Sequence, residues 1–121
     1  MTKKKTSRVG LRHKNKNIFL KVRKCTPFDE FFGLMFTKRK SAEALLFDFA
    51  GRKGLSLHSF FVFFPFLALW LDDKNNILEF RVVKPFSSGI SSKKLFAKII
   101  EIPINGKYRK IIRKLVDKRK I

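Results

Sequence analysis

Twelve consecutive residues without a polar side chain, Phe60 to Leu71, constrain the fold more than any other part of this chain. Apolar surface is unfavourable in water, so a run of this kind must be buried. It is shorter than the roughly 20 apolar residues of a membrane helix, and Pro65 interrupts it. Phenylalanine occupies four of the five positions from Phe60 to Phe64, which favours extended structure. We therefore predict buried strand structure here, with a membrane segment over Phe60 to Leu71 as the weaker alternative.

Apolar residues alternate or cluster in the remaining chain in the manner of further strands. The segments that show this pattern are 18–25, 44–49, 77–83 and 97–104. The polar connection 72–76 predicts a hairpin, since asparagine tolerates the left-handed conformation. Capping residues and apolar spacing predict short helices from Thr26 to about Gly33 and over 108–115. The predicted fold class is mainly β, as a sandwich or barrel-like domain, with one or two short helices.

A length of 121 residues is typical of one domain. Residues 1–17 lack sustained hydrophobic periodicity and predict a flexible basic arm that carries no core residue. Residues 18–121 are then a single β-rich domain with a basic C-terminal segment.

Positive charge is concentrated at both ends of the chain. The net charge is +20, of which residues 1–24 carry +10, residues 107–121 carry +7 and residues 25–106 carry +3. Basic segments bind phosphates, bind an anionic membrane surface, or are simply solvated. For the first case, the candidate polyanion-binding residues are Lys3, Lys4, Lys5, Arg8, Arg12, Lys14, Lys16, Arg109, Lys110, Arg113 and Lys114. The phenylalanines are expected in the core, which predicts recognition by shape and charge rather than by base stacking.

No set of residues predicts a catalytic or metal site. His58 and Ser59 are adjacent, so a strand would point them to opposite faces, and no third catalytic group is evident. Asp72 and Asp73 offer too few ligands for a cation and suit a turn. Glu79 and Glu101 are expected to face solvent, in contact with Arg81 or Lys98. The single cysteine, Cys25, excludes an internal disulfide and predicts a reducing compartment. No 7-to-15-residue apolar segment follows the basic start, so no secretory signal is indicated and the cytoplasm is predicted.

Several segments together resemble the family called domain of unknown function 192, in its archaeal form. They are GLMF at 33–36, LLFDF at 45–49, LHSFFVFFPFLALWLD at 57–72, KPF at 84–86 and IEIPING at 100–106. The positions that carry this resemblance include Gly33, Leu34, Met35, His58, Phe60, Phe61, Pro65, Pro85, Glu101 and Gly106. The resemblance implies a mostly β, sandwich-like domain over about residues 18–117.

The sequence departs from this family pattern at two positions. The family carries an arginine before the Phe-Pro pair and an aspartate two residues after the proline, where this chain has Phe63 and Leu67. Phe63 and Leu67 are apolar, so they cannot perform any role that the family's arginine and aspartate have. The family has no established activity, so the resemblance implies a fold and no reaction.

We predict from these observations a non-enzymatic binding module that contacts RNA, the ribosome or another polyanion through its basic ends. No cofactor, metal or defined small-molecule substrate is expected. The alternative is a β-sandwich domain that binds an apolar small molecule or a protein partner.

Overall fold

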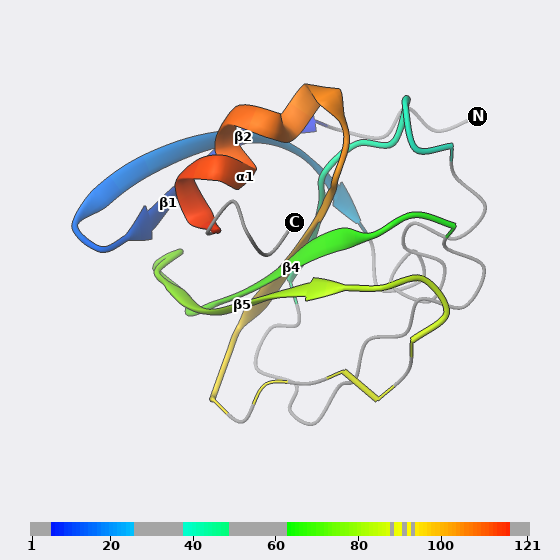
Figure 1. Cartoon of the computed structure of the whole chain (residues 1–121). Coiled ribbons are helices and arrows are strands. Elements are labelled where there is room, and N and C mark those ends of the chain that lie inside the picture. Colours follow the sequence, from blue (N-terminus) through cyan, green and yellow to red (C-terminus); the bar gives the residue numbers. More distant parts are fainter. Residues whose placement is uncertain are drawn as a thin grey trace.

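Six strands form a mixed sheet that curls into a half-barrel, with a short helical segment after the last strand (Figure 1). The computed structural model describes residues 6–25, 38–48, 63–87, 89–90, 92 and 94–116. The strands are β1 Thr6–His13, β2 Lys16–Cys25, β3 Leu45–Asp48, β4 Phe66–Leu71, β5 Ile77–Val83 and β6 Lys98–Pro103. The helical segment is η2 Gly106–Tyr108 followed by α1 Arg109–Leu115. The prediction of a mainly β fold is confirmed.

The strands lie in the order β1-β2-β3-β6-β4-β5. Neighbours are antiparallel except β2 and β3, which are parallel. β4 lies between β6 and β5, and all six of its residues are buried. Because successive side chains of a strand point to opposite faces, β4 is apolar throughout only when both faces of the sheet are covered. The long apolar run therefore supplies an interior strand.

Two apolar clusters lie on the two faces of the sheet. The helix-side cluster includes Leu67, Leu69 and Leu71 of β4 together with Ile112 and Leu115 of α1. The far-side cluster includes Phe66, Ala68 and Trp70 of β4, and its other members include Leu45, Phe47, Phe64, Val83 and Ile99. Phe64, Leu69 and Trp70 are buried as predicted, whereas Phe60 and Phe61 lie outside the described residues.

Phe63 was predicted in or beside the core, and this is wrong, because its side chain is 62% exposed. β4 begins only at Phe66, so Phe63 precedes the strand that carries the run into the interior.

The first strand overturns the prediction of a flexible arm over residues 1–17. β1 pairs with β2 from Thr6 to His13, and Leu11 is only 1% exposed within the helix-side cluster. The tip of β1 also reaches the β4–β5 turn, where the Arg12 amide donates to the carbonyl oxygen of Asn75 at 3.0 Å. This contact joins the two edge strands of the curled sheet. The domain therefore begins at or before Thr6, and the predicted boundary at residue 18 is too late.

The remaining predicted elements agree closely with the observed bounds. The strands predicted at 18–25, 44–49, 77–83 and 97–104 are β2, β3, β5 and β6, and the helix predicted over 108–115 is α1. The turn between β4 and β5 places Asn75 at φ 67°, in the left-handed region. The helix predicted from Thr26 to Gly33 lies outside the described residues. In the part of the chain that the structure describes, no helix is long and apolar enough to cross a membrane.

Candidate anion-binding site

A pocket of about 990 Å³ lies between the helical segment and the 38–41 turn. Residues just after β6, just before β4 and at the end of β5 complete its lining. Its apolar lining consists of Pro65, Val82, Ile104 and Ile112. Its polar lining is almost entirely basic, comprising Arg39, Lys40, Lys84, Lys107, Arg109 and Arg113 beside Asn105 and Gly106. Among the described residues, the pocket thus combines six cationic side chains with an apolar wall and has no acidic lining residue.

Asn105 joins two chain segments that line the pocket, the 38–42 segment and the start of the helical segment. Its Oδ1 accepts from the amide of Lys107 at 3.0 Å, and this bond caps η2. Its Nδ2 donates to the carbonyl oxygens of Arg39 at 2.7 Å and Ala42 at 3.1 Å. The Ala44 amide adds a further link, since it donates to the hydroxyl oxygen of Tyr108 at 2.7 Å. The 38–41 turn is thereby fixed against the start of the helix.

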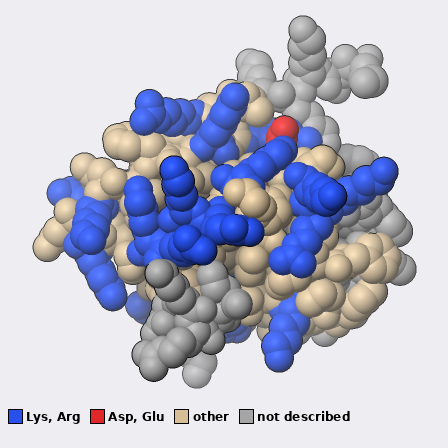
Figure 2. Space-filling model, turned by 45° about the horizontal axis from the view of Figure 1, so that its top comes forward, with Lys and Arg blue, Asp and Glu red and all other residues tan. Residues whose placement is uncertain are grey.

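Two of the pocket cations, Arg39 and Lys107, donate to neutral carbonyl oxygens. Arg39 Nε donates to the carbonyl oxygen of Ile104 at 2.7 Å, and Lys107 Nζ donates to that of Ser41 at 3.4 Å. Both acceptors are neutral, so these bonds orient the side chains without neutralising them. Within the described ranges, no acidic residue forms an ion pair with Arg109 or Arg113. Figure 2, in which the top of Figure 1 comes forward, shows Lys and Arg gathered over this face with little acidic surface between them.

The predicted polyanion-binding residues fall on two separate elements. Arg109 and Arg113 line the pocket, while Lys110 and Lys114 are exposed elsewhere on α1. The β1–β2 hairpin carries the exposed side chains of Arg8, Arg12, Lys14 and Lys16, none of which lines the pocket. Lys3, Lys4 and Lys5 lie outside the described residues.

Four basic residues of the pocket were missed from the sequence. Arg39, Lys40, Lys84 and Lys107 lie in turns or at element ends. The run Lys38 to Lys40 was a local signal, but its position beside the helix depends on the strand order.

Glu101 was expected to face solvent, and this is wrong. It lies on β6 between Leu45 of β3 and Ala68 of β4, and the residue is 5% exposed. Burial raises the pKa of its carboxyl group to about 8, because the charged form loses its hydration. The carboxyl group is therefore protonated at neutral pH in the folded protein.

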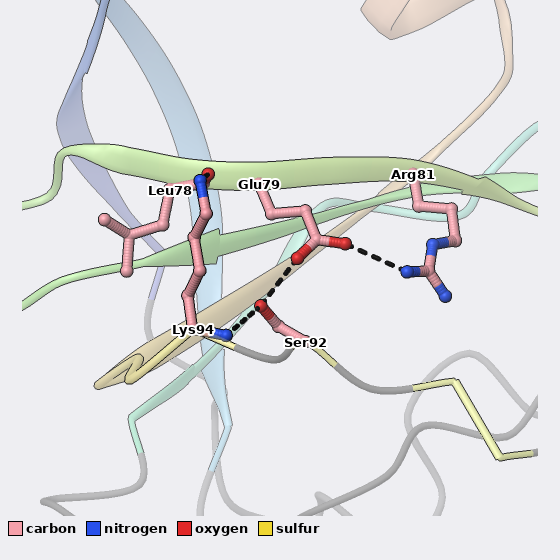
Figure 3. A network of polar contacts seen from close by, with 5 residues as sticks. All are labelled: Leu78, Glu79, Arg81, Ser92 and Lys94. Atoms are coloured by element: carbon pink, nitrogen blue, oxygen red, sulfur yellow. Dashed lines mark hydrogen bonds and ion pairs between the residues drawn. The ribbon is translucent and has the colours of Figure 1, made fainter.

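Glu79 contacts Arg81, but both residues belong to β5, so the pair lies along one strand and is not the cross-strand contact that was predicted. Arg81 Nη2 donates to Glu79 Oε2 at 2.9 Å, and Ser92 Oγ donates to Glu79 Oε1 at 2.7 Å (Figure 3). Lys94 adds two bonds, from its amide to Ser92 Oγ at 3.1 Å and from Nζ to the carbonyl oxygen of Leu78 at 2.8 Å. This network holds Ser92 and Lys94 against the edge strand β5, which is a structural role.

Asp72 serves the turn, as predicted. Its Oδ1 accepts from the amides of Lys74 and Asn76, both at 2.9 Å. Desolvation raises the pKa of Asp72, but the hydrogen bonds from Asn76 and Lys74 outweigh it, so the net pKa is lowered. Among the described residues, no three His, Cys, Asp or Glu side chains are grouped as a metal site.

The positions of the family resemblance are only partly described. Gly33, Leu34, Met35, His58, Phe60 and Phe61 lie outside the described residues. Pro65 and Gly106 line the pocket, and Pro85 follows the pocket residue Lys84. Leu67 is fully buried in the helix-side cluster, so an aspartate in its place would lie among apolar side chains.

Comparisons with known proteins identify a shared fold. No family model matches the chain, and no curated protein matches it, so the resemblance to domain of unknown function 192 stays a prediction. A solved structure from Sinorhizobium meliloti 1021, described as a "putative transcription regulator", is 20% identical with a TM-score of 0.73, over 92% of this chain and 89% of that one. A protein of unknown function from Novosphingobium aromaticivorans DSM 12444 is 13% identical with a TM-score of 0.67, over 88% of this chain and 78% of that one. At these identities the likeness establishes that the curled, mainly β fold recurs in both bacterial proteins.

Proposed function

We propose that this protein is a non-enzymatic module that binds RNA or another polyanion, and that the basic pocket is its principal contact. The observation that carries the proposal is the pocket lining, in which the described residues include six Lys or Arg side chains and no acid. These cations approach one another around a single pocket, and neutral carbonyl oxygens orient Arg39 and Lys107. An anion bound there relieves their mutual repulsion.

Phosphate groups fit this arrangement well. Arginine offers forked donors to phosphate oxygens, and Arg39, Arg109 and Arg113 contribute three such groups to one pocket. Each phosphate neutralised by Lys or Arg also releases counterions from a nucleic acid, which favours binding at low salt. A chain of phosphates occupies several of the six cations at once, whereas a single small anion occupies only a few.

The β1–β2 hairpin extends the basic surface beyond the pocket. Lys14 and Lys16 flank its tip, and Arg8 and Arg12 lie exposed along β1. A polyanion longer than the pocket makes additional contacts with this second group. The proposal therefore retains the predicted hairpin residues as secondary contacts.

The proposal is tested by the salt dependence of RNA binding. A fluorescent single-stranded RNA of about 15 nucleotides is titrated with protein between about 25 and 200 mM salt, and binding is measured by anisotropy. The double variant Arg109→Gln/Arg113→Gln should lower affinity about tenfold or more at low salt. It should also reduce the logarithmic salt slope by about 0.7 for each phosphate that the variant no longer neutralises.

The matched control is Lys74→Gln/Lys94→Gln. It also removes two positive charges, but from the β4–β5 turn and the segment before β6, neither of which lines the pocket. An equal loss of affinity in the control assigns the effect to net charge and overturns the pocket as the contact. Absence of RNA binding by the unmodified protein at low salt overturns the proposed function. Binding of a protein or apolar ligand that is insensitive to salt favours the alternative.

A further inference from the structure

Two exposed phenylalanines lie beside the basic pocket. Phe63 is 62% exposed and Phe86 is 55% exposed, and their ring centroids are 5.4 Å apart at an interplanar angle of 76°. The sequence indicated no exposed aromatic side chain for base stacking, because most phenylalanines were expected in the core, but these two are exposed. A pair of large apolar rings in water is unfavourable unless a ligand covers them.

The register of β4 and β5 places this pair next to the pocket lining. Phe66 pairs with Val83, and the same antiparallel register continued outward sets Pro65 opposite Lys84 and Phe63 opposite Phe86. Pro65 and Lys84 both line the pocket. Two residues span at most about 7 Å of backbone, so Phe63 and Phe86 each lie within this distance of a lining residue, Pro65 and Lys84.

The backbone holds Phe86 in a conformation that a bulky residue rarely adopts. Its φ is 59°, in the left-handed region that favours glycine. The turn is tied by a hydrogen bond from Ser87 Oγ to the carbonyl oxygen of Lys84 at 2.9 Å. More than half of this residue stays exposed, and backbone strain of this kind is concentrated at binding sites.

We propose that Phe63 and Phe86 form a stacking platform for the bases of single-stranded nucleic acid whose phosphates occupy the basic pocket. This inference rests on the proposed function and assigns its ligand class. Aromatic rings beside a basic groove are the combination that binds single strands, because every base offers a face for stacking. A duplex keeps its base faces stacked inside the helix, so the platform discriminates against it. The six Lys and Arg side chains of the pocket lining argue against an apolar or basic protein as the occupant.

The test compares two probes of equal charge. One is a single-stranded oligouridylate of about 15 nucleotides, and the other is a ribose-phosphate chain of the same length without bases. The protein should bind the oligouridylate about 5- to 100-fold more tightly, since stacking on aromatic side chains contributes that much per base. A duplex keeps its bases stacked inside the helix, so removal of the two rings should leave its affinity unchanged.

Two variants remove the platform while preserving the fold. Phe63→Ala/Phe86→Ala should reduce oligouridylate affinity to the abasic level and leave the salt slope unchanged. Phe86→Gly also removes a ring, but glycine accepts φ 59° without strain, so thermal stability should be kept or raised while affinity falls. A loss of binding in this variant therefore cannot come from unfolding.

The control is Leu95→Ala. Leu95 is a large apolar residue that is 75% exposed, and it lies before β6, outside the pocket lining. An equal loss of affinity in this control overturns the platform, as does equal binding of the two probes by the unmodified protein. If both probes bind equally with a steep salt dependence, stacking is refuted and polyanion binding stands. If neither probe binds at low salt, the proposed function fails as well.

Discussion

Replacing Glu101 with glutamine should make the folded protein less sensitive to rising pH. Glu101 lies in register with Leu45 and Ala68 on the far side of the sheet and is 5% exposed. Burial raises the pKa of its carboxyl group from an ordinary 4.5 to about 8. In the unfolded chain the group is exposed and has its ordinary pKa, so the folded state binds the proton more tightly.

The sign of the effect follows from this difference. Below pH 4.5 both states are protonated, and between pH 4.5 and about 8 only the folded state keeps the proton. The free energy of unfolding should therefore fall as pH rises through this window, by at most about 1.4 kcal/mol per pH unit. By pH 7 the loss from this residue is about 3 kcal/mol, a large share of a small domain's stability.

The assay is urea denaturation of the unmodified protein and Glu101→Gln at half-unit steps from pH 5 to 8.5. Glutamine is neutral at every pH, so the two proteins should differ little at pH 5, and the variant should become increasingly the more stable one. The difference at pH 5 measures the amide itself, and its growth with pH measures the carboxyl group. Glu79→Gln controls for the removal of one carboxylate from the sheet, since Glu79 is paired with Arg81. Parallel stability curves for Glu101→Gln and the unmodified protein would refute a protonated buried carboxyl group.

Three further outcomes are expected. Deleting residues 1–16 should unfold the domain, because β1 contributes to the helix-side cluster, whereas deleting residues 1–5 should preserve the circular dichroism spectrum. Phe66→Ala should lower the free energy of unfolding by about 3 to 5 kcal/mol, since Phe66 is 1% exposed. Phe63→Ala should change it by less than about 1 kcal/mol, because Phe63 is exposed. Equal effects of the two variants in a denaturant titration would contradict the assignment of the core. Asn105→Ala removes three hydrogen bonds and should cost about 1 to 3 kcal/mol while weakening anion binding, and unchanged stability would show that other contacts fix the turn.

The sequence predicted those parts of the fold that have a local signal. The run ending at Leu71 identified the buried strand, and alternation identified β2, β5 and β6 close to their observed bounds. β1 was missed because only Val9 and Leu11 mark its apolar side, while Arg8 and Arg12 suggested a solvated arm. Its pairing with β2 supplies the stability that its own composition does not indicate.

The candidate site was predictable only in part, because it depends on the order of the strands. Alternation correctly placed Glu101 on the face of β6 that Ile100 and Ile102 do not occupy. It could not show that this second face of the sheet is also buried. Arg109 and Arg113 were identified from helical spacing. Arg39 and Lys84 are far from them in the sequence, and only the strand order β3-β6-β4-β5 brings their segments together. Phe63 was misplaced because continuity of apolar residues was taken as continuity of burial.

The helix-side cluster also determines when the chain can fold during synthesis. It combines side chains from β1, the first strand, with those of α1, the last helix. A nascent chain that lacks residues 106–116 can form the β1–β2 hairpin, but the apolar faces of β4 and β6 that α1 contacts remain open. The pocket has the same dependence, because Lys107, Arg109 and Arg113 belong to the helical segment 106–115. The candidate anion-binding pocket therefore assembles together with the interior, since both require this segment to pack against the strands.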